Sequence, residues 1–210
     1  MCIRDRSQIK LLHSGGNGVS IVAPDSNPAS DRTLKLPSDG DGTILTTNSA
    51  TGKILQVLQT VKSDTFSLDG TATADITGLS QAITPSSTSN KILVSYTVNF
   101  AIKEGGYSCC LKLLRGSTQI FLGDAASNRG RYSNAFTSEN STDFGAYEYH
   151  IWTGSFLDSP NSTSATTYKL QLYSNNSGRT TYINRGKVDA DSATSGFRTA
   201  SQITVEEVAV

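Results

Sequence analysis

The stretch that decides the fold is Lys91-Ile-Leu-Val-Ser-Tyr-Thr-Val-Asn-Phe100. Apolar side chains occupy every second position, at Ile92, Val94, Tyr96, Val98 and Phe100, with Ser95, Thr97 and Asn99 between them. Successive side chains of an extended strand point to opposite faces, so this pattern buries one face and leaves the other in solvent. The stretch is therefore predicted to be a half-buried antiparallel strand.

Weaker versions of the same pattern lie on both sides of this stretch. Further strands are predicted at residues 54–61, 73–83, 109–115, 118–122, 147–157, 166–173, 180–184 and 201–208. Ser and Thr supply 54 of the 210 residues, and their preference for turns and strands favours the same fold class. No segment shows sustained helical periodicity. The chain is predicted to be all-β, with an antiparallel β-sandwich of jelly-roll or related type.

Three regions are predicted along the chain. Residues 1–6 lack the apolar core of a signal peptide and are interpreted as adapter-derived sequence, which would make the chain a C-terminal fragment of a longer metagenomic protein. Residues 7–52 are predicted to be short β-segments between turns, similar to a fibre shaft or connector. Residues 53–210 are expected to form the sandwich, as a C-terminal tip domain.

Charge and cysteine content argue against several classes of protein. The formal net charge is zero, so no general attraction to nucleic acid is expected. No run of about 20 apolar residues is present, so no membrane insertion is expected. Cys2, Cys109 and Cys110 form no C-x-x-C pattern, and His13 and His150 are far apart in the sequence. Free thiols, no metal site and no cofactor are predicted.

Catalytic patterns are weak throughout the sequence. The carboxylates Asp143, Glu148 and Asp158 show no spacing that would pair two of them across a sugar. Asp189 and Asp191 follow Arg185 in a polar segment, where a plain acidic loop is favoured over an ion site. The chain is therefore predicted not to be an enzyme.

An aromatic group allows two interpretations. Within 21 residues lie Tyr132, Phe136, Phe144, Tyr147, Tyr149 and Trp152, accompanied by Arg129, Arg131 and His150. Either these rings form part of the sandwich core, with Trp152 buried, or some of them stack on sugars. The long polar loop at residues 123–145 is the preferred place for host contact, because recognition residues often lie on loops. The receptor-binding candidates are Arg129, Arg131, Tyr132, Asn134, Phe136 and Phe144.

Several blocks of sequence resemble a known family. They lie at residues 23–37, 42–46, 52–57, 83–94, 113–118, 158–160, 165–168 and 182–185. In this order they resemble tail-fibre and other virion structural proteins of marine bacteriophages. The resemblance brings no catalytic residues with it.

The resemblance implies a place in the virion, in a tail or head fibre. It implies a homotrimer that joins other virion proteins through a region upstream of this chain. The C-terminal tip would then attach to a host-surface glycan or protein. The alternatives are a capsid decoration protein without a receptor role, a carbohydrate-binding β-sandwich module and a depolymerase.

Overall fold

A computed structural model describes residues 8–12, 14–16, 18–22, 53–103, 106, 108–138, 148–175 and 177–210. The chain divides into two compact units, Met1–Ser49 and Ala50–Val210. In the first unit, β1 (Gln8–Leu12) pairs antiparallel with β2 (Gly18–Val22). The shaft-like segments predicted between residues 23 and 52 lie outside the described residues.

The second unit is built from β-strands. They are β3 (Ile54–Lys62), β4 (Phe66–Asp69), β5 (Ala72–Ile83), β6 (Lys91–Ile102), β7 (Ser108–Arg115), β8 (Thr118–Ile120), β9 (Asn134–Thr137), β10 (His150–Asp158), β11 (Thr166–Ser174), β12 (Thr180–Ile183) and β13 (Ser201–Val208). The described residues contain no helix, so none of them forms a helix that could span a membrane.

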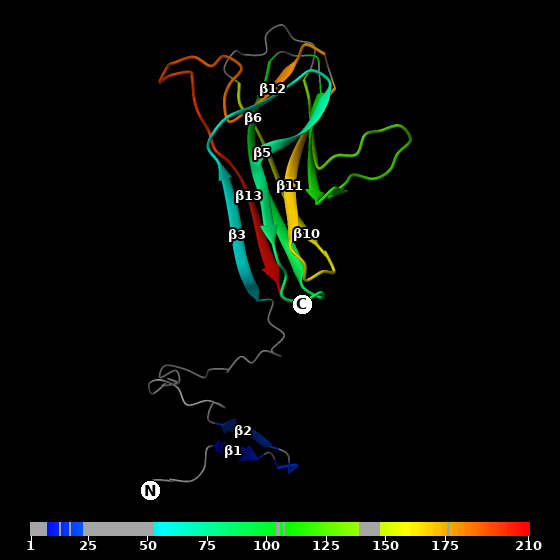
Figure 1. The fold of residues 1–210 in the computed structure, drawn as a ribbon, viewed down its shortest axis with the longest axis vertical. Coiled ribbons are helices and arrows are strands. Elements are labelled where there is room, and N and C mark those ends of the chain that lie inside the picture. Colours follow the sequence, from blue (N-terminus) through cyan, green and yellow to red (C-terminus); the bar gives the residue numbers. More distant parts are fainter. Residues whose placement is uncertain are drawn as a thin grey trace. The chain divides into compact units, whose positions relative to one another are not determined.

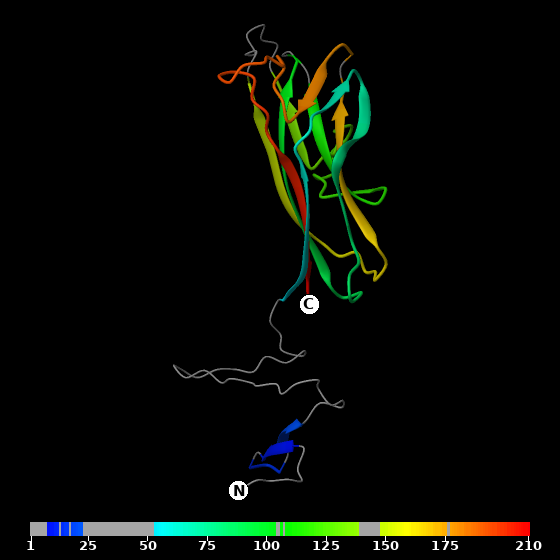
Figure 2. The same cartoon turned by 60° about the vertical axis from the view of Figure 1, so that its left-hand side comes forward.

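The strands form two antiparallel sheets that pack as a sandwich (Figures 1 and 2). Sheet I has the order β3-β13-β6-β10, and β12 with β4 extends it beside the end of β6. Sheet II has the order β5-β11-β7, with β8 and β9 both paired to the far edge of β7.

This strand order is that of a jelly roll. When β8 and β9 are taken as one position and the β4–β12 ribbon is set aside, eight strand positions remain. When these eight positions are numbered along the chain, their order across sheet I is 1-8-3-6 and their order across sheet II is 2-7-4-5. This is the arrangement of an eight-stranded double-sheet jelly roll. The predicted all-β sandwich of jelly-roll type is therefore confirmed.

The core lies between the sheets and follows the alternation of β6. Ile92, Val94 and Val98 are buried with the rings of Tyr96 and Phe100. Phe100 stacks on Trp152 of the neighbouring β10, with ring centroids 3.7 Å apart and an interplanar angle of 17°. Trp152 is only 5% exposed, so it belongs to the core, as the first of the two interpretations predicts.

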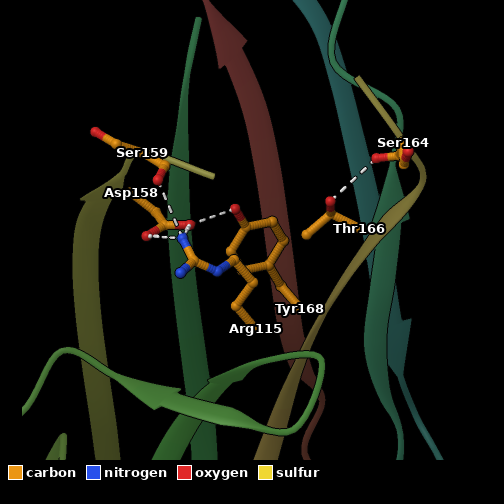
Figure 3. Close-up of polar contacts among 6 residues, drawn as sticks. All are labelled: Arg115, Asp158, Ser159, Ser164, Thr166 and Tyr168. Carbon is orange, nitrogen blue, oxygen red and sulfur yellow. Dashed lines mark hydrogen bonds and ion pairs between the residues drawn. The ribbon is translucent and has the colours of Figure 1, made fainter. Parts of the chain in front are cut away.

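A group of hydrogen-bonded side chains, Arg115, Asp158 and Tyr168, links the two sheets near the point where β10 ends and β11 begins (Figure 3). Arg115 Nη1 of β7 lies 2.9 Å from both carboxylate oxygens of Asp158 and donates to the carbonyl of Ser159 at 3.1 Å. Tyr168 of β11 donates its hydroxyl to Asp158 Oδ2 at 2.6 Å. The Asp158 carboxylate is buried, and Arg115 and Tyr168 satisfy it with three hydrogen bonds, which is the condition under which a buried charge is tolerated.

Replacing Arg115 with an uncharged residue should destabilise the sandwich. Arg115→Leu is expected to lower the free energy of unfolding by about 2 kcal/mol, because the buried Asp158 side chain loses its ionic partner. The cost stays moderate since the Arg115 side chain is 30% exposed and partly screened by water. Urea denaturation measures it. Arg129→Leu, at an exposed loop arginine, is the control and should change stability by less than about 0.5 kcal/mol.

Candidate functional site

A polar hollow lies in the loop between β12 and β13, residues 184–200. This loop is at the end of the sandwich opposite the start of β3 and the C-terminus (Figure 1). Its hollow has a volume of about 540 Å³, within the range of ligand pockets, and is open to solvent. The lining residues are Asp189, Ala190, Asp191, Ser192, Ala193, Gly196 and Arg198.

Asn184 fixes the loop to the sandwich. It directly follows β12, is fully buried and has a φ of 62°, a left-handed conformation that asparagine adopts more readily than most residues. Its side-chain amide donates to the carbonyls of Lys62 and Asp64, and its side-chain oxygen accepts from the Ser201 hydroxyl at 2.6 Å. Its own carbonyl accepts from the amide of Thr199. One residue therefore anchors both ends of the loop.

A salt-bridged carboxylate lies in the wall of the hollow. Arg198 Nη1 lies 2.6 Å from Asp189 Oδ1, and Arg185 Nη1 lies 3.6 Å from Asp189 Oδ2. The hydrogen bond from Arg198 lowers the pKa of the Asp189 carboxyl, so the group stays ionised near neutral pH. The guanidinium of Arg185 also lies 4.0 Å from the centre of the Tyr182 ring.

Backbone contacts shape the rest of the hollow. The amide of Gly196 donates to the Ser192 carbonyl at 2.9 Å. A Cβ at Gly196 would lie 1.7 Å from the Ala190 carbonyl oxygen, so only glycine fits this close approach. The next residue, Phe197, is 49% exposed, and its carbonyl accepts the Tyr149 hydroxyl at 2.8 Å. Phe197 is therefore an exposed aromatic residue whose two sequence neighbours, Gly196 and Arg198, line the hollow.

The arrangement does not favour an ion at Asp189 and Asp191. Asp189 already has two cationic partners. Across the described residues, no three His, Cys, Asp or Glu side chains come together as a metal-binding group. The acidic segment that contains Asp189 and Asp191 is therefore a salt-bridged part of the wall of the hollow.

The predicted receptor residues divide into two groups. Arg129, Arg131 and Tyr132 lie in the loop between β8 and β9, which extends from the side of the sandwich in both views (Figures 1 and 2). The two arginines are exposed, and Arg131 Nε donates to the Gly123 carbonyl at 2.6 Å. Tyr132 stacks on Tyr173 of β11 with ring centroids 5.3 Å apart.

The second group faces the interior. Asn134 accepts the Tyr96 hydroxyl at 2.5 Å and donates to the Thr153 carbonyl at 3.1 Å, which bridges the two sheets. Phe136 packs edge-on against Phe100 with centroids 5.5 Å apart. These contacts give Asn134 and Phe136 a structural role, while Phe144 lies outside the described residues. Arg129, Arg131 and Tyr132 remain as the surface part of the predicted set.

The thiols of Cys109 and Cys110 are buried. Burial raises the pKa of Cys109 to about 12 and that of Cys110 to about 11, so neither is a thiolate near neutral pH. Both are free cysteines. His150 packs against Phe136 with ring centroids 4.4 Å apart, and burial lowers its pKa. These residues contribute to packing, and the prediction that the chain is not an enzyme stays a prediction.

Comparisons with known proteins reach only distant structural likeness. No protein-family model matches the chain, and no curated protein is significantly similar to it in sequence. A chain in the structure of the Gx strain of infectious bursal disease virus matches at 12% identity with a TM-score of 0.36, over 93% of this chain and 47% of that chain. A structure of T=1 particles derived from infectious bursal virus matches at 10% identity with a TM-score of 0.36, over 92% of this chain and 47% of that chain. The chain spans about half the length of these structures, and the likeness is too distant to indicate a function.

Proposed function

We propose that this chain is a non-enzymatic structural protein of a bacteriophage virion, a subunit of a tail or head fibre. Its jelly-roll domain forms the tip of a homotrimeric appendage and attaches the particle to a host-surface glycan or protein. The observation that carries the proposal is the ordered resemblance to marine phage structural proteins between residues 23 and 185. Jelly rolls recur in viral capsid proteins and in lectins, so the fold is compatible with both parts of the role.

Two surfaces are available for attachment. Arg129 and Arg131 lie on the β8–β9 loop, and the β12–β13 loop holds the hollow lined by Asp189, Asp191 and Arg198. The second surface lies at the end of the sandwich away from the start of β3 (Figure 1). In an appendage whose upstream part joins the virion, that end is the one that would meet the host.

Immunogold labelling of particles tests the proposal and its main alternative. An antibody raised against the full chain is expected to label the ends of fibres. Label spread over the capsid surface would support the decoration-protein alternative and contradict attachment. A chain found only in cells, with no labelled particles, would contradict the virion role and favour a carbohydrate-binding module.

A further inference from the structure

The loop between β8 and β9, residues 121–133, carries two arginines that have no carboxylate partner. Arg129 and Arg131 are exposed, and neither forms a salt bridge with any residue that the structure describes. Asp124 is the one carboxylate in the sequence of this loop, and it does not pair with them either. The loop therefore presents unmatched positive charge on a chain whose formal net charge is zero.

Cationic side chains in other parts of the sandwich are matched by carboxylates. Five of them lie 2.6–3.6 Å from an aspartate oxygen, namely Lys62, Arg115, Lys169, Arg185 and Arg198. A guanidinium without such a partner can bind the oxygens of an external carboxylate, sulfate or phosphate through its paired N–H donors. The two loop arginines therefore differ from the paired arginines in being available to an anion.

Lys112 of β7 adds a third unmatched cation at the base of the loop. Its Nζ lies 5.3 Å from the centre of the Tyr173 ring and 5.8 Å from the centre of the Tyr132 ring. Its register partner on β11 is the neutral Gln171, and no carboxylate in the described part of the chain forms a salt bridge with it. The two rings attract the ammonium but leave its charge uncompensated.

The ring of Tyr132 brings the loop arginines and Lys112 together. It stacks on Tyr173 with an interplanar angle of 16°. Gly130, which lies between the two arginines in the sequence, packs its backbone against the same ring, because a Cβ there would lie 2.5 Å from Tyr132 Cε2. The three cations are therefore grouped around one aromatic stack.

Hydrogen bonds hold the loop in place before any ligand binds. Arg131 Nε donates to the Gly123 carbonyl at 2.6 Å, and the Arg131 carbonyl accepts from the side chain of Gln119 at 2.8 Å. The amide of Ser133 donates to the Leu111 carbonyl of β7 at 3.0 Å. Within the described residues, the two terminal nitrogens of Arg131 have no hydrogen-bond partner. A preordered loop with free donors loses less conformational entropy when it binds.

We propose that Arg129, Arg131 and Lys112 form a binding site for an anionic glycan, held together by the stack of Tyr132 and Tyr173. Carboxylate or sulfate groups of the sugar accept hydrogen bonds from the two guanidinium groups, and the ammonium adds a third positive charge. The β12–β13 hollow does not suit the same ligand, because two carboxylates line it. That the site takes an anion rests on the unmatched charges, and that the anion belongs to a glycan rests on the proposed function.

Isothermal titration calorimetry on the full chain tests the site. The probes are an oligogalacturonate, a sulfated oligosaccharide and a neutral malto-oligosaccharide of equal length. The wild type is expected to bind at least one acidic probe, more weakly as salt is added, and not to bind the neutral one. Which acidic probe binds tells whether the site prefers carboxylate or sulfate.

Charge reversal in the loop should weaken this binding. Arg129→Glu with Arg131→Glu is expected to lower the affinity by at least about tenfold, because two attractive charges become repulsive. Lys91→Glu with Lys187→Glu is the matched control, since it changes the net charge equally at two other lysines that have no salt bridge in the described chain. This control should bind as the wild type does.

A pair of glycine variants tests whether the aromatic stack positions the cations. Gly130→Ala should weaken binding several-fold, because its Cβ would collide with the Tyr132 ring and displace the arginines. Gly123→Ala, in the same loop, is the control, since a Cβ there meets nothing within 4 Å. Circular dichroism should show unchanged strand content in both variants. Equal affinities of the two variants would overturn the positioning role of Tyr132.

Three results would overturn the site itself. They are no binding to either acidic probe, equal binding to the neutral probe, and wild-type affinity in the charge-reversed loop variant. Single-stranded DNA of matched charge is a fourth probe, and tighter binding to it than to the acidic sugars would overturn the choice of a glycan. Particle labelling tests the virion role separately, so labelled fibre ends on a chain that binds no acidic probe would remove this site alone.

Discussion

Trp152→Ala is expected to lower the free energy of unfolding by about 3–5 kcal/mol, the usual cost of deleting a large buried aromatic ring. The indole stacks on Phe100 in the middle of the core, with ring centroids 3.7 Å apart. Deleting it would leave the surrounding apolar side chains without a packing partner. For a unit of this size the midpoint of thermal unfolding should fall by about 10 °C. Chemical denaturation with fluorescence or circular dichroism measures the change.

Phe197→Ala is the matched control for that variant. It also deletes an aromatic ring, but one that is 49% exposed in the β12–β13 loop. Its cost should stay under about 1 kcal/mol. If the two variants lost equal stability, Trp152 would not be the core residue described above. The pair therefore tests whether Trp152 is packed in the core.

Lowering the pH should remove a large contribution of Glu207 to the free energy of unfolding. This residue of β13 is 1% exposed, and its carboxylate accepts hydrogen bonds from Gln56, Asn90 and the amide and hydroxyl of Ser86, all at 2.6–2.7 Å. Burial alone would raise its pKa, but these hydrogen bonds outweigh it and lower the pKa from 4.5 to about 2. The folded state therefore binds this proton less readily than the unfolded chain.

A lowered pKa in the folded state fixes the sign of the pH dependence. The contribution of Glu207, about 3 kcal/mol, is complete above pH 4.5 and disappears as the pH falls through about 2. The free energy of unfolding of the wild type and of Glu207→Gln should therefore differ at pH 7 and converge near pH 2. Asp124→Asn, at an exposed loop position, is the control and should follow the wild type. A constant difference at every pH would contradict the ionised state of Glu207.

The strongly alternating strands could be predicted from the sequence. The segment 91–100 corresponds to β6 (Lys91–Ile102), and the segment 201–208 corresponds to β13 with the same limits. β4 and β9 were missed, because four residues are too few to show a period. The chain leaves β8 before Leu122 because Phe121 adopts a φ of 53°. The sheet order required the structure, since β3 pairs with a strand about 140 residues away.

The functional surfaces were harder to predict. Asp189 and Asp191 drew attention as carboxylates, but nothing in the sequence shows that Arg198 returns to Asp189 across the loop. The sequence does not single out Gly196 or the neighbouring Phe197, because the requirement for glycine comes from the close approach of the Ala190 carbonyl to Gly196. Glu207 did leave a signal, since it falls on the same alternating face of β13 as Ile203 and Val205. A charged residue at a core position indicates a buried network, and this one was not recognised.

The most direct test of the virion role is mass spectrometry of gradient-purified virus particles from the sample that encodes this chain. The tryptic peptide at residues 92–103, which contains most of β6, provides a diagnostic mass. If the chain is a fibre subunit, this peptide should co-purify with intact particles and with peptides of the capsid. Recovery of the peptide only from the cellular fraction, with capsid peptides present in the particles, would contradict the proposed function.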